Sequence, residues 1–364
     1  MAGFRYGRVR ACSSPEGSNI AGDSDGAYTR SVKGICLILL CALPAAAAPS
    51  RHTLEHGGLK RLYWLDAPEK AEGRRWPVVI ALHGGGGNAE GMRRKTKFEQ
   101  LGAGKDFIAV HPEGFAQRRL GKSLATWNVG FCCGAARKKQ IDDVGFLSAL
   151  IDELVDKYDA DPKRIYVTGH SNGGMMAYRL ACEIPGKIAA IAPVGALVRE
   201  DSCVQKSPMP VLIVHGVEDD CANYGGGEDC GGCFERFLGL PTKGDNNGAC
   251  TAVPAHAAKW VAAQGCGKSP ETSSVGPATR LLYSGCRAPV VFDAISGHGH
   301  GWPGLLAEES SAACRKRPDG FLCRRWRRVI GPYASGYSAS AEIWNFFKDK
   351  TRRRTAVPPR KPLE

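Results

Sequence analysis

A serine between two glycines follows an apolar run near the middle of the chain. The segment TGHSNGGMMAYRLAC, Thr168 to Cys182, contains a G-x-S-x-G pattern with Ser171 at its centre. The RIYV run before it predicts a strand, and the residues after it predict a helix. In that context Gly169 and Gly173 allow a sharp turn that exposes the serine hydroxyl as a nucleophile. A turn that merely needs small residues is the alternative interpretation.

A serine hydroxyl becomes a good nucleophile only when a base removes its proton and an acid orients that base. On a strand–turn–helix nucleophile site the chain order is serine, acid, histidine. The acids Glu218, Asp219 and Asp220 follow the predicted strand VLIVHG, and His298 and His300 follow the predicted strand VVFDAI. The order therefore fits, while the spacing leaves open which acid and which histidine act. Glu218 is the least favoured of the acids.

Acyl transfer also requires backbone N–H donors directed at the developing oxyanion. The run HGGGGN follows the predicted strand WPVVIAL and stands where one donor is expected, and the amide of Asn172 is the other candidate. Glycines of this kind also bind phosphate. A dinucleotide site would need G-x-G-x-x-G at the start of a long helix, which is not clear here.

Short apolar runs alternate with helical patterns along the middle of the chain. This alternation predicts an α/β fold with a mostly parallel central sheet flanked by helices. Strands are expected in 76–84, 106–114, 164–169, 187–196, 211–216 and 288–295, and helices in 142–158, 173–184, 255–264 and 340–350. The Cys-rich stretches 220–253 and 305–338 lack a period and are expected to be irregular insertions.

These motifs are similar to those of the secreted polyhydroxybutyrate depolymerase family of α/β-hydrolases, a group that includes feruloyl and acetyl xylan esterases. The shared segments are LHGGGGN, WN…CCG, IDDVGFL, GHSNGGMMAYRLAC, PVLIVHGVED, GHGHGWPG and EIWNFF, and they cover roughly 55–350. The resemblance implies an α/β-hydrolase fold with Ser171 as nucleophile, Asp219 as acid and His300 as base. Asp220 and His298 become the second choices.

The resemblance carries further expectations. Gly85 becomes the leading choice for the second oxyanion amide, and neither a cofactor nor a metal is implied. It also implies a bridge between Cys266 and Cys286, and two more among Cys132, Cys133, Cys182 and Cys203. The Cys-bearing insertion after DDCANYGGG and the basic segment after WPG depart from the family pattern, which leaves substrate specificity open.

The cysteine content indicates an oxidising compartment. Twelve of the fifteen cysteines follow the apolar segment GICLILLCALPAAAA, which has basic residues before it and small residues at its end. We therefore expect 1–48 to be an N-terminal extension with a signal peptide, 49–356 a single catalytic domain and 357–364 a disordered tail. Cys314 and Cys323 could close a small loop. A zinc site built from Cys221, Cys230, Cys233 and Cys250 is the less favoured alternative to disulfides.

Positive charge is concentrated at the C-terminal end. The chain has a formal net charge of +13, and residues 315–364 hold fourteen Lys or Arg against four acids. We favour the interpretation that this region is a solvated basic tail without a binding role. The alternative is that it attracts an anionic polymer. Nucleic-acid binding is not expected, because no binding module is recognisable. The longest apolar run is shorter than the roughly 18 residues of a membrane span.

Other residues are expected to be structural. Structural roles are expected for the histidines His83, His111 and His170. The start of a helix is expected to be capped and given negative charge by Asp142 and Asp143. Packing roles are expected for Trp302 and Trp344.

The sequence thus predicts a secreted, extracellular or periplasmic, serine carboxylic-ester hydrolase that acts on small or polymeric esters. The alternatives are a feruloyl or acetyl xylan esterase acting on plant cell walls, a non-catalytic binding protein on a hydrolase scaffold and, more weakly, a peptidase.

Overall fold

The computed structural model describes residues 49–70, 73–119, 122–202, 207–228, 230–239, 249–267 and 269–352. The chain divides into two units, Met1–Ala45 and Ala46–Glu364, and all described residues belong to the second. The predicted signal peptide, the predicted tail and Cys203 lie outside the described residues. None of the described helices has the length and apolar character needed to cross a bilayer.

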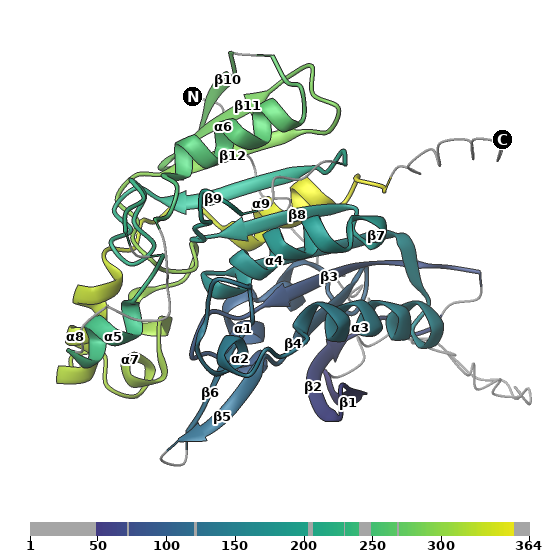
Figure 1. Ribbon diagram of the computed structural model, residues 1–364, viewed down its shortest axis with the longest axis horizontal. Coiled ribbons are helices and arrows are strands. Elements are labelled where there is room, and N and C mark those ends of the chain that lie inside the picture. Colours follow the sequence, from purple (N-terminus) through teal and green to yellow (C-terminus); the bar gives the residue numbers. More distant parts are fainter. Residues whose placement is uncertain are drawn as a thin grey trace, which may run out of the picture. The chain divides into compact units, whose positions relative to one another are not determined.

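One large sheet forms the centre of the second unit (Figure 1). Its strands are β1 (Ser50–His56), β2 (Leu59–Asp66), β3 (Trp76–Leu82), β4 (Ile108–Pro112), β7 (Ala160–His170), β8 (Ala190–Val194), β9 (Val211–Gly216), β10 (Glu271–Val275), β11 (Ala278–Tyr283) and β12 (Val290–Ile295). They lie in the order β1-β2-β4-β3-β7-β8-β9-β12-β11-β10. A separate hairpin consists of β5 (Phe115–Arg119) and β6 (Lys122–Thr126).

The strands from β4 to β12 in this order run parallel, whereas the pairs at both edges are antiparallel. The central strands are almost completely buried, as expected for a parallel sheet covered on both faces. With a sharp turn at Ser171 between the central strand β7 and the helix that follows it, this is the α/β-hydrolase arrangement predicted from the sequence. The predicted fold class is therefore confirmed.

Helices cover both faces of the sheet, and further helices lie in the insertions. They are α1 (Ala89–Thr96), α2 (Gly134–Lys138), α3 (Asp143–Lys157), α4 (Asn172–Glu183), α5 (Cys233–Leu238), α6 (Val253–Ala263), α7 (Ala312–Lys316), α8 (Phe321–Ile330) and α9 (Ala339–Phe347). Alternate side chains of β3 point to opposite faces. Val78 and Ile80 pack in the core under α3, α4 and α6, whereas Val79 and Ala81 pack in the core under α1 and α9.

The two Cys-rich insertions contain helices that the sequence did not predict. The stretch 220–253 includes α5, and the stretch 305–338 includes α7 and α8. Figure 1 shows α5, α7 and α8 together on one side of this unit, and α5 contacts α8 directly. Phe237 and Trp326 meet edge to face, with 5.5 Å between ring centroids. The insertions therefore pack against one another rather than remaining irregular.

Disulfides connect many of the loops. The expected bridges Cys266–Cys286 and Cys314–Cys323 are present. Cys132 and Cys133 are bonded to each other, and Cys182 is disulfide-bonded as well. The insertion after β9 holds two further bridges, Cys221–Cys233 and Cys230–Cys250. Disulfides are thus confirmed as the use of these cysteines.

Candidate active site

Ser171 lies at the turn between β7 and α4, with φ 55° and ψ −120°. A positive φ is costly for a residue with a Cβ and persists only when the surroundings enforce it. Here the serine amide donates to the carbonyl of Val194 at 2.9 Å, and its carbonyl accepts from the amide of Met175 at 2.9 Å. The turn is therefore a constrained elbow at the carboxyl end of the central strand.

The glycines on either side of Ser171 permit this elbow. A Cβ on Gly173 would lie 2.3 Å from the carbonyl oxygen of Leu82, and one on Gly169 would lie 2.4 Å from the backbone of Gly173. Real Cβ atoms do not approach backbone this closely. The backbones of strand and helix therefore approach closely at this turn, and the two glycines permit that approach.

Asp219 and His300 are brought together from two different strand ends. Asp219 follows β9 and His300 follows β12, and Oδ2 of the carboxylate lies 2.7 Å from Nδ1 of the imidazole. Both side chains are buried. Oδ1 of Asp219 accepts backbone N–H groups from Cys221 at 2.9 Å and from Ala222 at 2.8 Å.

The surroundings of Asp219 favour its charged form. Burial alone would raise its pKa, but the interactions with His300 and His215 outweigh burial and hold the pKa well below its ordinary value. Nε2 of His215 lies 3.3 Å from the carboxylate and 2.7 Å from the carbonyl of Ala222. The site thus holds an ionised acid beside an imidazole at neutral pH.

The second-choice residues are engaged elsewhere. Asp220 is exposed, and its carbonyl accepts from Arg236. Glu218 accepts the amide N–H of His298 at 3.0 Å, and Nδ1 of His298 accepts from the amide of Ala334 at 3.2 Å. The structure therefore pairs Asp219 with His300, which spacing alone did not decide.

The candidate oxyanion donors lie next to each other. Asn172 is the first residue of α4, and a Cβ on Gly85 would lie 3.8 Å from the Cβ of Asn172. The amides of Gly86 and Gly87 donate to the carbonyls of Ala125 and Gly84. Because the amides of Gly86 and Gly87 already have acceptors, the amide of Gly85 is the better candidate for an oxyanion donor.

A support for Asn172 was missed by the sequence reasoning. Its side-chain oxygen accepts from the amide of Trp127 at 2.7 Å, and its Nδ2 donates to the Trp127 carbonyl at 3.1 Å. The indole of Trp127 donates to the carbonyl of His83 at 2.9 Å. The WN pair was visible in the sequence as a shared motif, but its contact with the elbow depends on the fold.

His170 packs against the imidazole of His300, with 4.9 Å between ring centroids. Burial, followed by the proximity of His300, lowers the pKa of His170 well below its ordinary value. This histidine therefore remains neutral beside the pair. His83 and His111 are also buried and hydrogen-bonded to neighbouring groups.

The expected packing role of the two tryptophans agrees with the structure. Trp302 is buried and donates to Ser340, and Trp344 stacks on Phe107 with 4.0 Å between centroids.

Metal-type ligands meet at one place in the part of the chain that the structure describes. One ligand atom each of Cys221, Cys233 and His300 lies within 4.8 Å of the others. Both sulfurs belong to the same disulfide, and a cysteine binds zinc as a free thiolate, so neither can act as a zinc ligand in this state. Cys230 and Cys250 form the second bridge. The four cysteines are therefore arranged as disulfides rather than as a zinc site.

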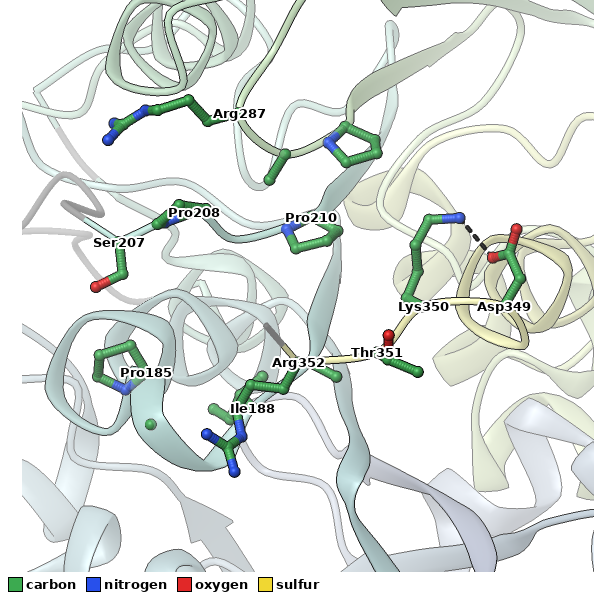
Figure 2. Close-up of a pocket in the computed structure, with 14 residues that line it drawn as sticks. Pro185, Ile188, Ser207, Pro208, Pro210, Arg287, Asp349, Lys350, Thr351 and Arg352 are labelled. Atoms are coloured by element: carbon green, nitrogen blue, oxygen red, sulfur yellow. Dashed lines mark hydrogen bonds and ion pairs between the residues drawn. The ribbon is translucent and has the colours of Figure 1, made fainter. Parts of the chain in front are cut away.

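A pocket of about 240 Å³ lies at the opposite end of the sheet (Figure 2). Its lining includes Ile188, Pro210 and Pro289, which precede β8, β9 and β12. Figure 2 shows the ion pair between Lys350 and Asp349 at its margin. Sites in parallel sheets lie at the carboxyl ends of the strands, so this pocket is separate from the candidate active site.

Residues 61–223 match the model of the family described as Esterase PHB depolymerase. The bifunctional acetylxylan esterase/xylanase XynS20E of Neocallimastix patriciarum is 30% identical over 148 residues, 41% of this chain and 20% of that protein. Feruloyl esterase B of Piromyces equi is 29% identical over 233 residues, 62% of this chain and 39% of its own length. The chain thus spans less than half the length of these relatives.

A solved acetyl xylan esterase from Aspergillus awamori superimposes with a TM-score of 0.46 at 14% identity, covering 69% of this chain and 94% of that one. The predicted resemblance to the depolymerase family is confirmed by the family match over 61–223. The relatives named here are carboxylic ester hydrolases by description.

Proposed function

We propose that the protein is a secreted serine carboxylic-ester hydrolase that acts through Ser171, His300 and Asp219 and a covalent acyl-enzyme. The observation that carries the proposal is the buried 2.7 Å contact between Asp219 Oδ2 and His300 Nδ1, at strand ends next to the elbow that holds Ser171. A nucleophile elbow together with an oriented imidazole is the arrangement that acyl transfer requires.

In the first half of the reaction, His300 takes the proton of Ser171 as its Oγ attacks the ester carbonyl. Asp219 accepts the Nδ1–H of His300, which keeps Nε2 available as the base and stabilises the imidazolium. The amides of Asn172 and Gly85 stabilise the oxyanion. The imidazolium then protonates the leaving alcohol.

In the second half of the reaction, His300 activates a water molecule that attacks the acyl-enzyme. The acid product leaves, and the proton returns to Ser171. These steps involve only protons and the acyl group, so the residues named above suffice for them.

The substrate class is an ester of a carboxylic acid with a small or polymeric alcohol. Hydroxyalkanoate esters are the first candidate, and the match to the family described as Esterase PHB depolymerase supports them. Feruloyl or acetyl esters on plant cell-wall polysaccharide are the second candidate, because relatives described as feruloyl and acetylxylan esterases align with the chain.

Secretion is part of the proposal. Fully formed disulfides are typical of extracellular or periplasmic proteins, and five bridges are present among the described residues. N-terminal sequencing of protein from the culture medium tests the expected cleavage near Ala47 or Ala48. A mature chain that still begins at Met1 contradicts it.

Labelling with a fluorophosphonate tests the nucleophile. We expect modification of Ser171 in the folded protein and hydrolysis of short p-nitrophenyl esters. Ser171→Ala should lower kcat/KM by at least about 10³-fold, since it removes the attacking group. Ser296→Ala, at an exposed serine, is the matched control.

A panel of hydroxybutyrate oligomers, methyl ferulate, acetylated xylan and a peptide then separates the substrate classes. Absence of labelling and of ester turnover in folded protein would favour a non-catalytic binding protein on this scaffold. Faster cleavage of the peptide than of the esters would favour a peptidase.

A further inference from the structure

The Cys221–Cys233 disulfide lies against the imidazole of His300. A ring nitrogen of His300 and the two sulfurs are within 4.8 Å of one another. Cys221 is fully buried, and it is only two residues from Asp219. The bridge therefore forms one wall of the proposed catalytic pair.

The backbone of Cys221 also holds the carboxylate. Its N–H donates to Oδ1 of Asp219, while Oδ2 of the same carboxylate faces Nδ1 of His300. The position of Cys221 thus affects the acid through a hydrogen bond and the base through a sulfur that lies within 4.8 Å of a ring nitrogen. A shift of this one residue would move both partners of the 2.7 Å contact.

The other end of the bridge is anchored in the insertions. Cys233 is the first residue of α5, and Arg236 in the same helix donates to the carbonyls of Asp220 and Gly231. Helix α5 packs on α8, whose last residue, Ile330, accepts the backbone N–H of His300 at 2.5 Å. The disulfide, α5 and α8 together connect the acid loop to the histidine loop; we call this unit the clasp.

The loop that the bridge closes, 221–233, is rich in glycine. Gly226, Gly227, Gly231 and Gly232 all have positive φ, and glycine-rich segments lose the most entropy on ordering. A cross-link reduces that entropy cost by restricting the unfolded chain. The Cys230–Cys250 bridge restrains another part of this loop, whereas Cys221–Cys233 is the cross-link made by Cys221 itself.

We propose that the Cys221–Cys233 disulfide is a positioning element of the catalytic pair, which holds Asp219 and His300 in contact and thereby sets kcat. The inference rests on the proposed function. Displacements of about 1 Å in a catalytic geometry lower rates by as much as about 100-fold. Loss of this bridge should therefore impair the chemical step more than substrate binding.

The test compares two double variants. Cys221→Ser/Cys233→Ser removes the clasp bridge, and Cys266→Ser/Cys286→Ser removes a bridge between the loop after α6 and the loop after β11, outside the loops of Asp219 and His300. The bridged cysteines are 12 and 20 positions apart in the sequence, so the two bridges restrict the unfolded chain to a similar extent, and removing either should cost similar stability. Both variants should unfold at lower urea concentration than the parent.

Only the first variant should lose kcat, by about 10- to 100-fold on a p-nitrophenyl ester, with KM within threefold of the parent. Fluorophosphonate labelling of Ser171 should slow by a similar factor. Equal kcat values for both double variants, measured where both are folded, overturn the proposal. A parent that neither turns over esters nor is labelled overturns the proposed function instead.

A second experiment does not depend on the folding of a variant. A dithiol reductant opens accessible disulfides of the parent protein to thiols and is itself oxidised to a cyclic disulfide. Mass spectrometry after thiol alkylation reports which bridge is open at each stage. Activity should fall in step with the opening of Cys221–Cys233 and return on reoxidation. Full activity with this bridge open, or a loss that follows another bridge, contradicts the proposal.

Discussion

Gly173 shows at the level of one residue how closely the backbones of the elbow approach. Gly173→Ala would place a Cβ 2.3 Å from the carbonyl oxygen of Leu82, which only a backbone shift can relieve. We expect the free energy of unfolding to fall by about 1–3 kcal/mol or more and the labelling of Ser171 to slow. Urea unfolding and fluorophosphonate kinetics measure the two effects.

The control for this variant is Gly186→Ala. A Cβ at Gly186 has nothing within 4 Å, and its φ is not in the left-handed region, so we expect a change within about 0.5 kcal/mol. Equal stability and equal labelling in both variants would show that the elbow tolerates a shift of its helix.

Residue types and chain order predicted Ser171 as nucleophile and limited the acid and the base to a few candidates. Spacing did not separate His298 from His300, because both lie in the same loop after one strand. The two histidines differ because a segment distant in the sequence packs beside this loop. The carbonyl of Ile330 accepts the backbone N–H of His300 and fixes its position. The resemblance to a family decided this point where local pattern did not. That the triad is functional remains a prediction.

At the scale of elements, a buried ion pair connects β2 to the start of α3. Arg61 lies 2.6 Å from Asp143, both are buried, and the second oxygen of Asp143 accepts the amide N–H of Asn128. The adjacent Asp142 is the N-cap of α3, and its side chain accepts from Gly145. The expected capping role was thus confirmed for Asp142, whereas Asp143 has a buried partner that the sequence did not reveal.

These two neighbouring aspartates make a matched pair of variants. Asp143→Ala leaves Arg61 as an uncompensated buried charge, so we expect a loss of about 3–5 kcal/mol in the free energy of unfolding. Asp142→Ala removes an exposed cap and should cost about 1 kcal/mol. Urea unfolding measures both losses, and similar values for the two variants would contradict the importance of the buried pair.

The central strands were predictable because burial on both faces makes them continuous apolar runs, as in VLIVHG. The edge strands β1 and β10 were missed because most of their residues are exposed and polar. Helix α8 was missed for another reason. Its apolar face, which includes Trp326, packs on α5 rather than on the main core, so its pattern among the arginines gave no clear signal.

At the scale of the whole molecule, buried histidines link stability to pH. Burial lowers the pKa of His83 to about 4 and those of His111 and His256 to about 3. The unfolded chain binds protons at these residues below about pH 6.5, whereas the folded protein does not until about pH 4 or 3. The free energy of unfolding should therefore fall on acidification from pH 6.5, by about 1.4 kcal/mol per pH unit for each histidine.

Urea unfolding between pH 7 and pH 5 measures this slope. His256→Gln should reduce the slope by the share of one histidine, because glutamine can still accept the indole N–H of Trp260 but does not titrate. An unchanged slope would show that His256 is not neutral in the folded protein.

Positive charge is unevenly distributed over the chain, and α8 carries part of it. Arg324 and Arg328 are exposed on this helix together with Phe321. The alternative to a merely solvated basic region, attraction to an anionic polymer, can be tested at this face. Arg324→Ser/Arg328→Ser should elute from a carboxymethyl-cellulose column at lower salt than the parent.

Lys60→Ser/Lys105→Ser removes the same charge from exposed positions elsewhere and is the control. It should shift elution less. Equal shifts in both double variants would assign the retention to net charge alone.

Strand β10 ends the large sheet with Glu271, Thr272, Ser273 and Ser274 all exposed. Flat, apolar edge strands can pair with strands of other copies of a chain, whereas edge strands with charged and polar side chains resist such pairing. The outermost strand on this side thus offers a poor template for fibril growth. A sheet of this width can accordingly form at high protein concentration without its last strand becoming a nucleus for aggregation.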